Sequence, residues 1–315
     1  MFVIHPIDMK LTLRQLEIFV AIAHEENVSR AADRLAMSQS AASSALVELE
    51  RQFDCLLFDR IGKALRINSL GTGLLPLAQS LLAQARDVEA YLAGGRPGPL
   101  SVAATLTIGN YLATLLVADY TQRHPDSPVH LQVANTASVV DRLLGLEVDL
   151  ALIEGEATHP DLVLEPWLDD ELVVFCAPGH PLAGNGKVPT TRLASEHWVL
   201  RERGSSTRSL FDRAVAARLK TFRLRLELEH TEAIKRAVES GLGIGCLSRL
   251  ALREAFRRGS LVEVPTPQFD LRRRFHIAHH RQRSPSRAMS SFMDLCRALA
   301  LGATSTAELP LPFIP

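Results

Sequence analysis

Long apolar runs are absent from this sequence. No window approaches the stretch of about 18 consecutive apolar residues that a membrane-spanning helix needs. The first residues contain Pro6 and Asp8, where a secretory signal peptide would have its apolar segment. We therefore expect a cytoplasmic protein with no membrane partner.

Cysteine is also scarce, and its placement disfavours two classes of protein. The four cysteines lie far apart and form no Cys-x-x-Cys pair, which argues against a zinc ribbon and a disulfide framework. Three histidines match no zinc-ligand spacing with any cysteine, and we interpret them as surface or strand residues. The sequence therefore predicts no metal and no cofactor. The residues are Cys55, Cys176, Cys246 and Cys296, with His276, His279 and His280.

Net charge is missing as well. The 35 basic and 35 acidic side chains cancel, so no overall field attracts nucleic acid, and any such partner must be recognised locally. The 315 residues, 47% hydrophobic and 22% charged, indicate a globular protein rather than a disordered one. This length suits one large domain or a few ordinary ones.

Enzyme signatures are absent too. The sequence has no Gly-x-Ser-x-Gly turn, no phosphate-binding Gly-Lys-Ser/Thr loop and no recognisable pair of catalytic carboxylates. Residues Gly241–Gly245 lack the Gly-x-Gly-x-x-Gly spacing of a dinucleotide site and precede a predicted strand, so they indicate a tight turn. We conclude that the protein is not an enzyme.

A capping box opens the first predicted helix. Thr12 and Gln15 have the Thr-x-x-Gln spacing in which two side chains satisfy two backbone donors reciprocally. Apolar residues then recur every three or four positions as far as Ala23, which predicts an amphipathic helix with one face toward a core.

Two short helices follow, separated by a brief turn. Ser29 is a natural N-cap for a helix over 30–35, and Ser38 for a helix over 39–52. Residues 36–37 form the tight turn between them. This arrangement is typical of a helix-turn-helix, whose second helix enters the major groove of DNA.

A wing and a long helix complete the N-terminal region. Residues 53–67 predict a two-stranded wing with 61–63 at its tip. Asn68 can cap the next helix, which extends over about 71–92. This helix is amphipathic and would be exposed on two sides unless it paired with another copy, so we expect a homodimer through it.

A change in composition marks a boundary after this helix. Gly94–Pro99 combines glycine and proline in a way that suits a short hinge. Beyond it, strand-like runs alternate with helical stretches, which predicts an α/β fold with largely parallel sheets. The strand series pauses near 165–167 and 265–267, as two lobes with crossing strands would explain. The runs are 100–104, 129–133, 149–153, 172–175, 199–201, 224–228 and 244–247.

Four N-terminal segments form one ordered pattern: Phe19–Ala21, Ser29–Leu35, Ser38–Ser43 and Leu57–Arg60. This pattern resembles the winged helix-turn-helix signature of LysR-type transcriptional regulators, and the resemblance covers roughly residues 11–300. It implies an α/β protein with an N-terminal winged helix-turn-helix, a long linker helix and a two-lobed, periplasmic-binding-protein-like effector domain. It also implies double-stranded operator DNA at a promoter as a partner, a homotetramer, and RNA polymerase as a candidate partner.

The predicted domain boundaries follow from the pattern and the resemblance together. The DNA-binding domain covers 1–69, the linker helix 70–93 and the hinge 94–99. The effector-binding domain covers 100–302, and a tail over 303–315 lies outside the resemblance. Within the effector domain, lobe I takes about 100–166 and 268–302, and lobe II takes about 167–267.

A narrower resemblance concerns the ligand. Four segments, Thr107–Tyr111, Glu165–Leu168, Leu200–Ser205 and Gly241–Ser248, are similar to the branch of the family that is tied to sulfur metabolism and responds to sulfite. The resemblance therefore implies sulfite as the effector. Two positions depart from family habit. Asp54 stands where the family usually turns with glycine, and His230 stands where a small hydroxyl or amide pair is more usual.

The charge of the N-terminal region argues mildly against DNA binding, because residues 1–67 contain one more acidic than basic side chain. We expect four glutamates, Glu25, Glu26, Glu48 and Glu50, to lie at helix ends away from the basic leading edge. Gln39 suits an adenine edge, serines suit bases or phosphates, and basic residues suit phosphates, although Ser29 and Ser38 also serve as caps. The candidate DNA-binding residues are Ser29, Arg30, Arg34, Ser38, Gln39, Ser40, Ser43, Arg60, Lys63 and Arg66.

Hydroxyl-rich turns follow three predicted strands of the effector region. Small ligands bind beyond the carboxyl ends of strands in open α/β folds, and anions favour helix N-termini. Each turn alone is better explained by helix capping, but three turns in facing lobes predict a pocket for a small oxyanion. Arg201 and Arg203 can pair with the nearby Glu202, and His230 either adds a donor or caps the helix at Thr231. The candidate effector-binding residues are Thr105, Thr107, Asn110, Asn135, Thr136, Ser138, Arg203, Ser205, Ser206, Thr207 and His230.

A second class of function fits part of the chain. A two-lobed domain that binds a small anion would suit a solute-binding protein for transport, without any DNA role. The absence of an export signal and the presence of the first 93 residues favour the transcriptional regulator.

Overall fold

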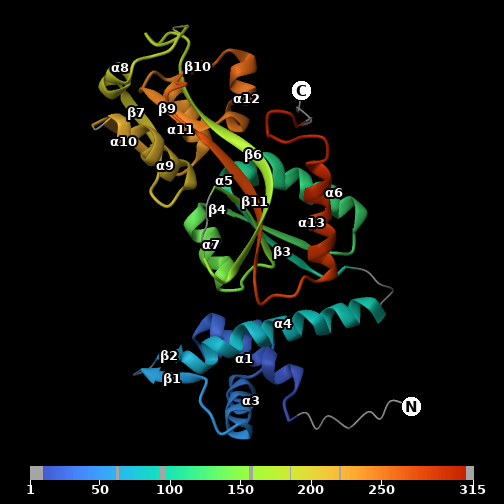
Figure 1. Ribbon diagram of the computed structural model, residues 1–315. Coiled ribbons are helices and arrows are strands. Elements are labelled where there is room, and N and C mark those ends of the chain that lie inside the picture. Colours follow the sequence, from blue (N-terminus) through green and yellow to red (C-terminus); the bar gives the residue numbers. More distant parts are fainter. Residues whose placement is uncertain are drawn as a thin grey trace. The chain divides into compact units, whose positions relative to one another are not determined.

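The computed structural model describes residues 10–61, 64–92, 97–155, 159–184, 186–219 and 221–309. The chain divides into two compact units, of which the first is Met1–Gly95 with Gln282–Ser286 and the second is Arg96–Arg281 with Arg287–Pro315 (Figure 1). Each unit has a hydrophobic core of its own. Residues 94–96 of the predicted hinge lie outside the described residues.

The first unit opens with three helices, α1 (Leu13–Glu25), α2 (Val28–Arg34) and α3 (Gln39–Gln52). The predicted capping box at Thr12 is present and starts α1. The three helices pack around a core that includes Phe19 of α1, which is fully buried.

The caps of α2 and α3 correct one prediction and confirm another. The N-cap of α2 is Asn27, whose side chain accepts the N–H of Arg30, so the predicted cap at Ser29 is wrong. Ser29 already lies inside the first turn of the helix, where its backbone is helical. Ser38 caps α3 as predicted, by accepting the N–H of Ala41. Between these helices Ala36 adopts a left-handed φ of 52°, which closes the tight turn.

The wing consists of β1 (Phe58–Ile61) and β2 (Ala64–Ile67), which pair antiparallel as predicted. Residues 62 and 63 at its tip lie outside the described part of the chain. Asp54 has the left-handed conformation, with φ 48°, that glycine usually supplies.

The long helix α4 covers Ser69–Leu92. The side chain of Asn68 caps it by accepting the N–H of Gly71 at 2.9 Å, as the sequence predicts. Gly71 is required here, because a Cβ would collide with the carbonyl oxygen of Leu57. One face of α4 contributes to the core of the first unit through Ala78 and Leu82.

A second face of α4 exposes apolar side chains at spacings of seven, four, seven and four residues, which places them on a single stripe of the helix. We call this set the α4 stripe. It consists of Leu70, Leu77, Leu81, Val88 and Leu92.

Lobe I of the second unit contains β3 (Leu100–Thr105), which pairs in parallel with β4 (Val129–Ala134) and β5 (Leu150–Glu154). Helices cover this sheet, and α13 packs beside α6 (Figure 1). The helical elements are α5 (Leu106–Ile108), η1 (Gly109–Ala113), α6 (Thr114–Arg123), α7 (Thr136–Leu144) and α13 (Arg287–Leu299).

Lobe II repeats this plan. Its central strand β7 (His197–Arg201) pairs in parallel with β8 (Arg223–Leu228) and β9 (Ile244–Ser248). A short strand, β10 (Val262–Val264), which the sequence does not predict, pairs antiparallel with β6 (Leu162–Cys176). The helical elements are α8 (Thr190–Ser195), α9 (Ser206–Phe211), η2 (Asp212–Ala216), α10 (Ala217–Leu219), α11 (Thr231–Glu239) and α12 (Arg249–Arg258).

Two antiparallel strands cross between the lobes, as predicted. They are β6 (Leu162–Cys176) and β11 (Arg272–His280), which run side by side (Figure 1). Residues 165–167 are not a break between strands but part of β6, where a register shift accommodates Pro166. The sequence predicts only the end of β6 and does not predict β11 at all.

The tail folds onto the second unit as far as residue 309. Ser305 forms a parallel bridge with Asp169 of β6, and Leu309 is fully buried in the lobe I core. None of the described helices is long and apolar enough to cross a membrane.

Candidate DNA-binding surface and effector cleft

The candidate base-reading residues lie together on the first unit. Gln39 is the first residue of α3, and its side chain is exposed. Ser40 is exposed and shares a hydrogen bond with Ser38 at 3.1 Å, and Ser43 is half-buried one turn further along. Ser29 is exposed on α2. The start of α3 therefore presents short polar side chains to solvent, which is what a recognition helix needs.

The basic residues of this surface are not separate from the acidic ones. Arg34 pairs with Glu25 at 3.3 Å and Arg30 with the same glutamate at 3.5 Å, while Arg66 pairs with Glu26. The expectation that the glutamates at the end of α1 lie away from the basic edge is therefore wrong, because the turn after α1 brings them beside α2 and the wing.

These ion pairs lie at the surface of the first unit. All three arginine side chains are more than half exposed, and exposed ion pairs stabilise a fold by at most about 1 kcal/mol. Lys63 lies outside the described residues, as does the side chain of Arg60.

The first of the three predicted anion turns is already occupied by the protein itself. The backbone N–H of Thr107 donates to the carboxylate of Glu154 at 2.6 Å, and the hydroxyl of Thr105 donates to the carbonyl of Leu152 at 3.4 Å. Both threonines are buried. The prediction that this turn binds the oxyanion directly is contradicted, because Glu154 at the end of β5 takes the donors.

A buried ionic cluster surrounds this glutamate. Arg273 of β11 donates to Glu154 at 2.6 Å and to Asp170 of β6 at 2.8 Å. It also donates to the hydroxyls of Thr207 at 3.0 Å and Thr107 at 3.4 Å. The guanidinium group thus links both crossing strands and both lobes.

The electrostatics of the cluster favour the charged forms. Burial acts most strongly on Glu154 and would raise the pKa of its carboxyl, but attraction by Arg273 and then Arg201 outweighs it, so the pKa lies below its ordinary value. The three charged residues of the cluster, Glu154, Asp170 and Arg273, were not among the residues predicted from the sequence. One signal was available in the sequence. Leu271, Arg273 and Phe275 stand at alternate positions, and alternate residues of a strand share one face, which is the buried face here.

The other two predicted turns do come together. Ser206 of lobe II donates its backbone N–H to the hydroxyl of Thr136 in lobe I at 3.2 Å, and Ala137 donates its N–H to the carbonyl of Gly204 at 3.2 Å. Asn135 caps α7 by accepting the N–H of Ser138 at 3.0 Å. The capping interpretation is therefore right for Asn135, while Thr136 and Ser206 meet across the lobes.

A cavity of about 730 Å³ lies where these turns meet, and we call it the effector cleft. Its wall carries hydroxyls, histidines and arginines, and Asp141 is its sole carboxylate among the described residues. The lining residues are Thr136, Ala137, Val140, Asp141, Gly155, His159, Gly204, Ser206, Ser209, Leu210, Arg213, Arg272, Arg273, Arg274 and His276.

Two groups on this wall can donate hydrogen bonds to a ligand. The hydroxyl of Ser206 is shielded from solvent and has no hydrogen-bond partner among the described residues. The Ser206 side chain lies against Gly155. The φ of 73° at Gly155 favours glycine, and the absence of a side chain there keeps the backbone close to Ser206. Arg213 is exposed at the rim and has no ion-pair partner within the described ranges.

The remaining predicted effector residues do not line the cleft. Ser205 and Thr207 are buried, Ser138 is half-buried, and Asn110, Arg203 and His230 are exposed elsewhere. His230 is the N-cap of α11, but its side chain makes no capping bond. Of the two partners expected for Glu202, Arg201 forms a bidentate pair with it at 2.8 and 2.9 Å.

The described cysteines of the second unit are not poised for reaction. Burial raises the pKa of the Cys176 thiol to about 11 and that of Cys246 to about 12, and it also raises the pKa of Cys296. Thiols become reactive when their pKa is lowered, so these three residues serve as core residues.

The fold and the two sites define a class of protein: a DNA-binding winged helix-turn-helix joined to a two-lobed domain with a small polar cleft. Comparison with known families identifies it further. A model of the lysR-family bacterial regulatory helix-turn-helix protein matches residues 13–72, and a model of the LysR substrate binding domain matches residues 93–300. The chain belongs to the LysR family of transcriptional regulators, which are not enzymes.

Individual relatives agree with this assignment. The chain is 42% identical to the uncharacterized HTH-type transcriptional regulator YeiE of Escherichia coli over 288 residues, which cover 91% of this chain and 98% of YeiE. A single-residue variant of full-length OxyR from Pseudomonas aeruginosa is 25% identical with a TM-score of 0.74, over 96% of this chain and 100% of that one. The CcmR regulatory domain of Synechocystis PCC6803, in complex with 2-PG, is 33% identical with a TM-score of 0.60, over 64% of this chain and 96% of the domain.

Family membership settles the class of function. The protein is a LysR-type DNA-binding transcriptional regulator with an effector-binding domain, and regulators of this family bind small-molecule effectors and form oligomers. The alternative of a solute-binding protein without a DNA role is thereby excluded.

Proposed function

We propose that the effector of this regulator is a small oxyanion, such as sulfite, which binds in the effector cleft. The observation that carries the proposal is the unpartnered, solvent-shielded hydroxyl of Ser206 in a wall rich in hydroxyls and arginines, within the part of the chain that the structure describes. A buried polar group without a partner is unfavourable, and an oxyanion is a strong acceptor that would satisfy it.

The composition of the wall supports an inorganic anion over an aromatic or long aliphatic ligand. Thr136, Ser206 and Ser209 supply hydroxyls from both lobes, and Arg213 supplies a charge at the rim. Val140 and Leu210 are the only large aliphatic residues among the described lining residues, too few for an apolar ligand.

The negative charge of Glu154 limits where an anionic ligand can bind in the cleft. Its carboxylate already accepts from Thr107 and Arg273, so a second anion at that spot would meet a buried negative charge. We therefore place the effector on the outer side of Arg273, toward Ser206 and Thr136. Binding there would change how strongly the turns of the two lobes hold each other.

Anion binding is expected to depend on Ser206. A ligand at a hundredfold excess over its dissociation constant stabilises the fold by about 2.7 kcal/mol, which thermal unfolding with sulfite, sulfate, phosphate and a carboxylate detects. Ser206→Ala removes one hydrogen bond to a charged ligand and should weaken binding roughly tenfold or more. Calorimetric titration measures the dissociation constants.

Ser290→Ala is the matched control, because Ser290 is exposed on α13 and does not line the cleft. It should bind the anion as tightly as the unchanged protein. The proposal fails if none of the anions stabilises the protein, or if Ser206→Ala binds the preferred anion with unchanged affinity.

We further propose that α3 reads operator bases through Gln39, Ser40 and Ser43, and that the basic residues of α2 and the wing contact phosphates. The α4 stripe would join two copies into a homodimer, as its five exposed apolar side chains support. Assembly into a homotetramer, contact with RNA polymerase and action in the cytoplasm, where bacterial DNA lies, stay predictions.

The division between base and phosphate contacts is testable with two variants. Gln39→Ala should cost about 1–3 kcal/mol of discrimination between the operator and a mutated site. Lys63→Ala should weaken binding to all duplexes alike and reduce the salt slope by about one. Fluorescence anisotropy across a salt series measures both, and equal effects of the two variants on specificity would refute the division.

A further inference from the structure

We propose that residues 303–309 form a strap that positions Arg273 in the effector cleft, acting through Thr306 and Asp170. The family match ends at residue 300, so the strap lies beyond the residues that it covers. The inference rests on the proposed effector site for its ligand readout, while its second readout does not depend on any ligand.

The strap is docked by backbone hydrogen bonds. The N–H of Asp169 donates to the carbonyl of Thr304 at 3.0 Å, and the N–H of Thr306 donates to the carbonyl of Asp169 at 2.8 Å. The opposite edge of β6 pairs with β11 at this point, where Asp169 of β6 lies opposite Arg274 of β11. The strap therefore behaves as a short extra strand beside the two crossing strands.

The strap also touches both lobes. The side chain of Leu309 is fully buried in the lobe I core, and burial of this apolar surface stabilises the docked strap. The carbonyl of Leu309 accepts from Arg253 of α12, in lobe II, at 2.9 Å. Glu308 closes the strap on itself by accepting the N–H of Thr304 at 2.7 Å. These contacts make it an ordered part of the domain.

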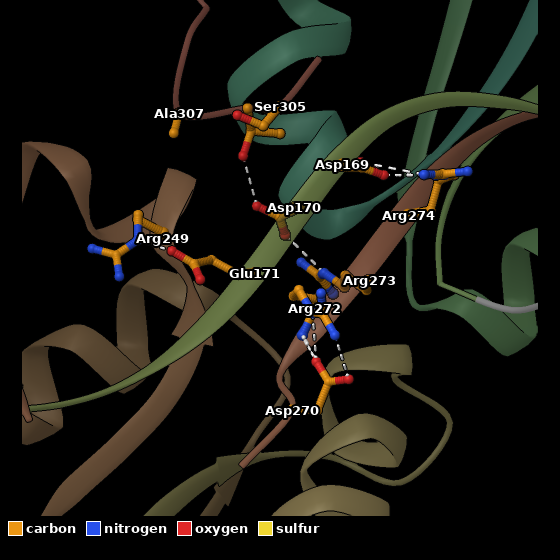
Figure 2. A pocket seen from close by; sticks show the side chains of 11 residues that line it. Asp169, Asp170, Glu171, Arg249, Asp270, Arg272, Arg273, Arg274, Ser305 and Ala307 are labelled. Atoms are coloured by element: carbon orange, nitrogen blue, oxygen red, sulfur yellow. Dashed lines mark hydrogen bonds and ion pairs between the residues drawn. The ribbon is translucent and has the colours of Figure 1, made fainter. Parts of the chain in front are cut away.

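One side chain carries the connection from the strap to the cleft. The carboxylate of Asp170 accepts from the hydroxyl of Thr306 at 2.8 Å and from that of Ser248 at 2.9 Å on one oxygen. Its other oxygen accepts from Arg273 at 2.8 Å. Figure 2 shows Asp170 on β6 with Ser305 of the strap on one side and Arg273 on the other.

Loss of the Thr306 hydroxyl would therefore change how firmly Arg273 is held in position. Asp170 is buried, and a buried carboxylate that loses one of its three donors is held less firmly in the position where Arg273 contacts it. Arg273 in turn fixes Glu154, which holds the amides of Thr107 and Ile108. The chain of contacts runs from the strap to the wall of the effector cleft.

The groove beside the strap has a balanced charge, with four acidic and four basic side chains among its described lining residues. It has a volume of about 530 Å³, and its charged side chains pair with one another, as the dashed lines of Figure 2 show. Arg274 pairs with Asp169, Arg272 with Asp270, and Arg249 with Glu171. The positioning of Arg273 is accordingly the role that the contacts support.

The test compares Thr306→Val, which removes the hydroxyl at nearly constant volume, with Thr306→Ser, which keeps it. Thr304→Val is the matched control, because the Thr304 hydroxyl contacts only Glu308 within the strap. Thr306→Ala replaces the valine variant if valine prevents folding. Hydrogen–deuterium exchange of the full chain and titration with sulfite, sulfate and phosphate are measured for each variant.

Thr306→Val is expected to speed exchange of the Thr107 and Ile108 amides several-fold, up to about tenfold, because a lost hydrogen bond to a charged group is felt along the cluster. It should also weaken anion binding by a similar factor. Thr306→Ser should match the unchanged protein, and Thr304→Val should speed exchange only within the strap.

Two results separate failure of the strap from failure of the effector site. If the unchanged protein binds an anion and Thr306→Val neither weakens binding nor speeds exchange at Thr107 and Ile108, the strap only anchors the chain end and the inference is overturned. If no anion binds to the unchanged protein, the effector proposal fails, and the exchange at Thr107 and Ile108 alone decides the role of the strap.

Discussion

Replacing Arg273 with methionine is expected to lower the free energy of unfolding by about 3–5 kcal/mol at neutral pH. The substitution keeps an unbranched apolar stem but leaves Glu154 and Asp170 buried without the cation that they share. A buried charge that loses its partner is strongly destabilising, whereas an exposed pair contributes little. Chemical denaturation of the purified protein measures the change.

The size of this effect should depend on pH. The pKa of Glu154 lies below its ordinary value of 4.5 in the folded protein, so its ionised form stabilises the fold above that pH and the contribution is lost as the pH falls through the lowered value. Without Arg273, burial raises the pKa of the Glu154 carboxyl, which then takes up a proton at higher pH. The gap between the variant and the unchanged protein should therefore narrow from pH 7 toward pH 5.

Arg272→Met is the control for this experiment. Arg272 is exposed and pairs with Asp270 in the loop before β11, so its loss should leave the unfolding curve unchanged. A gap for Arg273→Met that stays constant between pH 7 and pH 5 would show that the cost comes from packing and not from the two carboxylates.

Leu77→Asp is expected to break the proposed dimer and to weaken operator binding by a factor of about 100 or more. Leu77 is 62% exposed and belongs to the α4 stripe. Burial of a leucine stabilises by about 1.5–3 kcal/mol, a symmetric interface buries it twice, and aspartate adds a charge there. Operator affinity falls with the dimer, because each half-site is held by a single helix.

Leu301→Asp is the matched control, since Leu301 is 82% exposed in the second unit and outside the α4 stripe. Sedimentation velocity and fluorescence anisotropy at one protein concentration report the assembly state and the operator affinity. An unchanged sedimentation coefficient for Leu77→Asp would place the dimer interface elsewhere.

Local signals predicted the first unit well. The capping box at Thr12, the cap at Ser38 and the cap at Asn68 are each formed by residues within a few positions of one another, so spacing in the sequence is sufficient to find them. The cap at Ser29 was misplaced by two residues because Asn27 is an equally good cap, and only the backbone conformation distinguishes them.

The effector cleft could be predicted only in part. Thr136 and Ser206 follow strands and begin helices, which is a local pattern, and both line the cleft. The occupation of the Thr107 turn by Glu154 could not be predicted, because 47 residues separate the donor from the acceptor. No spacing rule connects two residues that meet only when parallel strands align.

The sequence by itself determined the class of this protein. The helix-turn-helix, the wing, the apolar stripe of the long helix and the alternation of strands and helices all depend on neighbours along the chain, whose conformational preferences act before any distant contact forms. The tertiary structure alone decided that Arg273 joins two carboxylates between the lobes and that the tail docks on β6. Those contacts arise between strands far apart in sequence, where burial, and not local preference, selects which charges must meet.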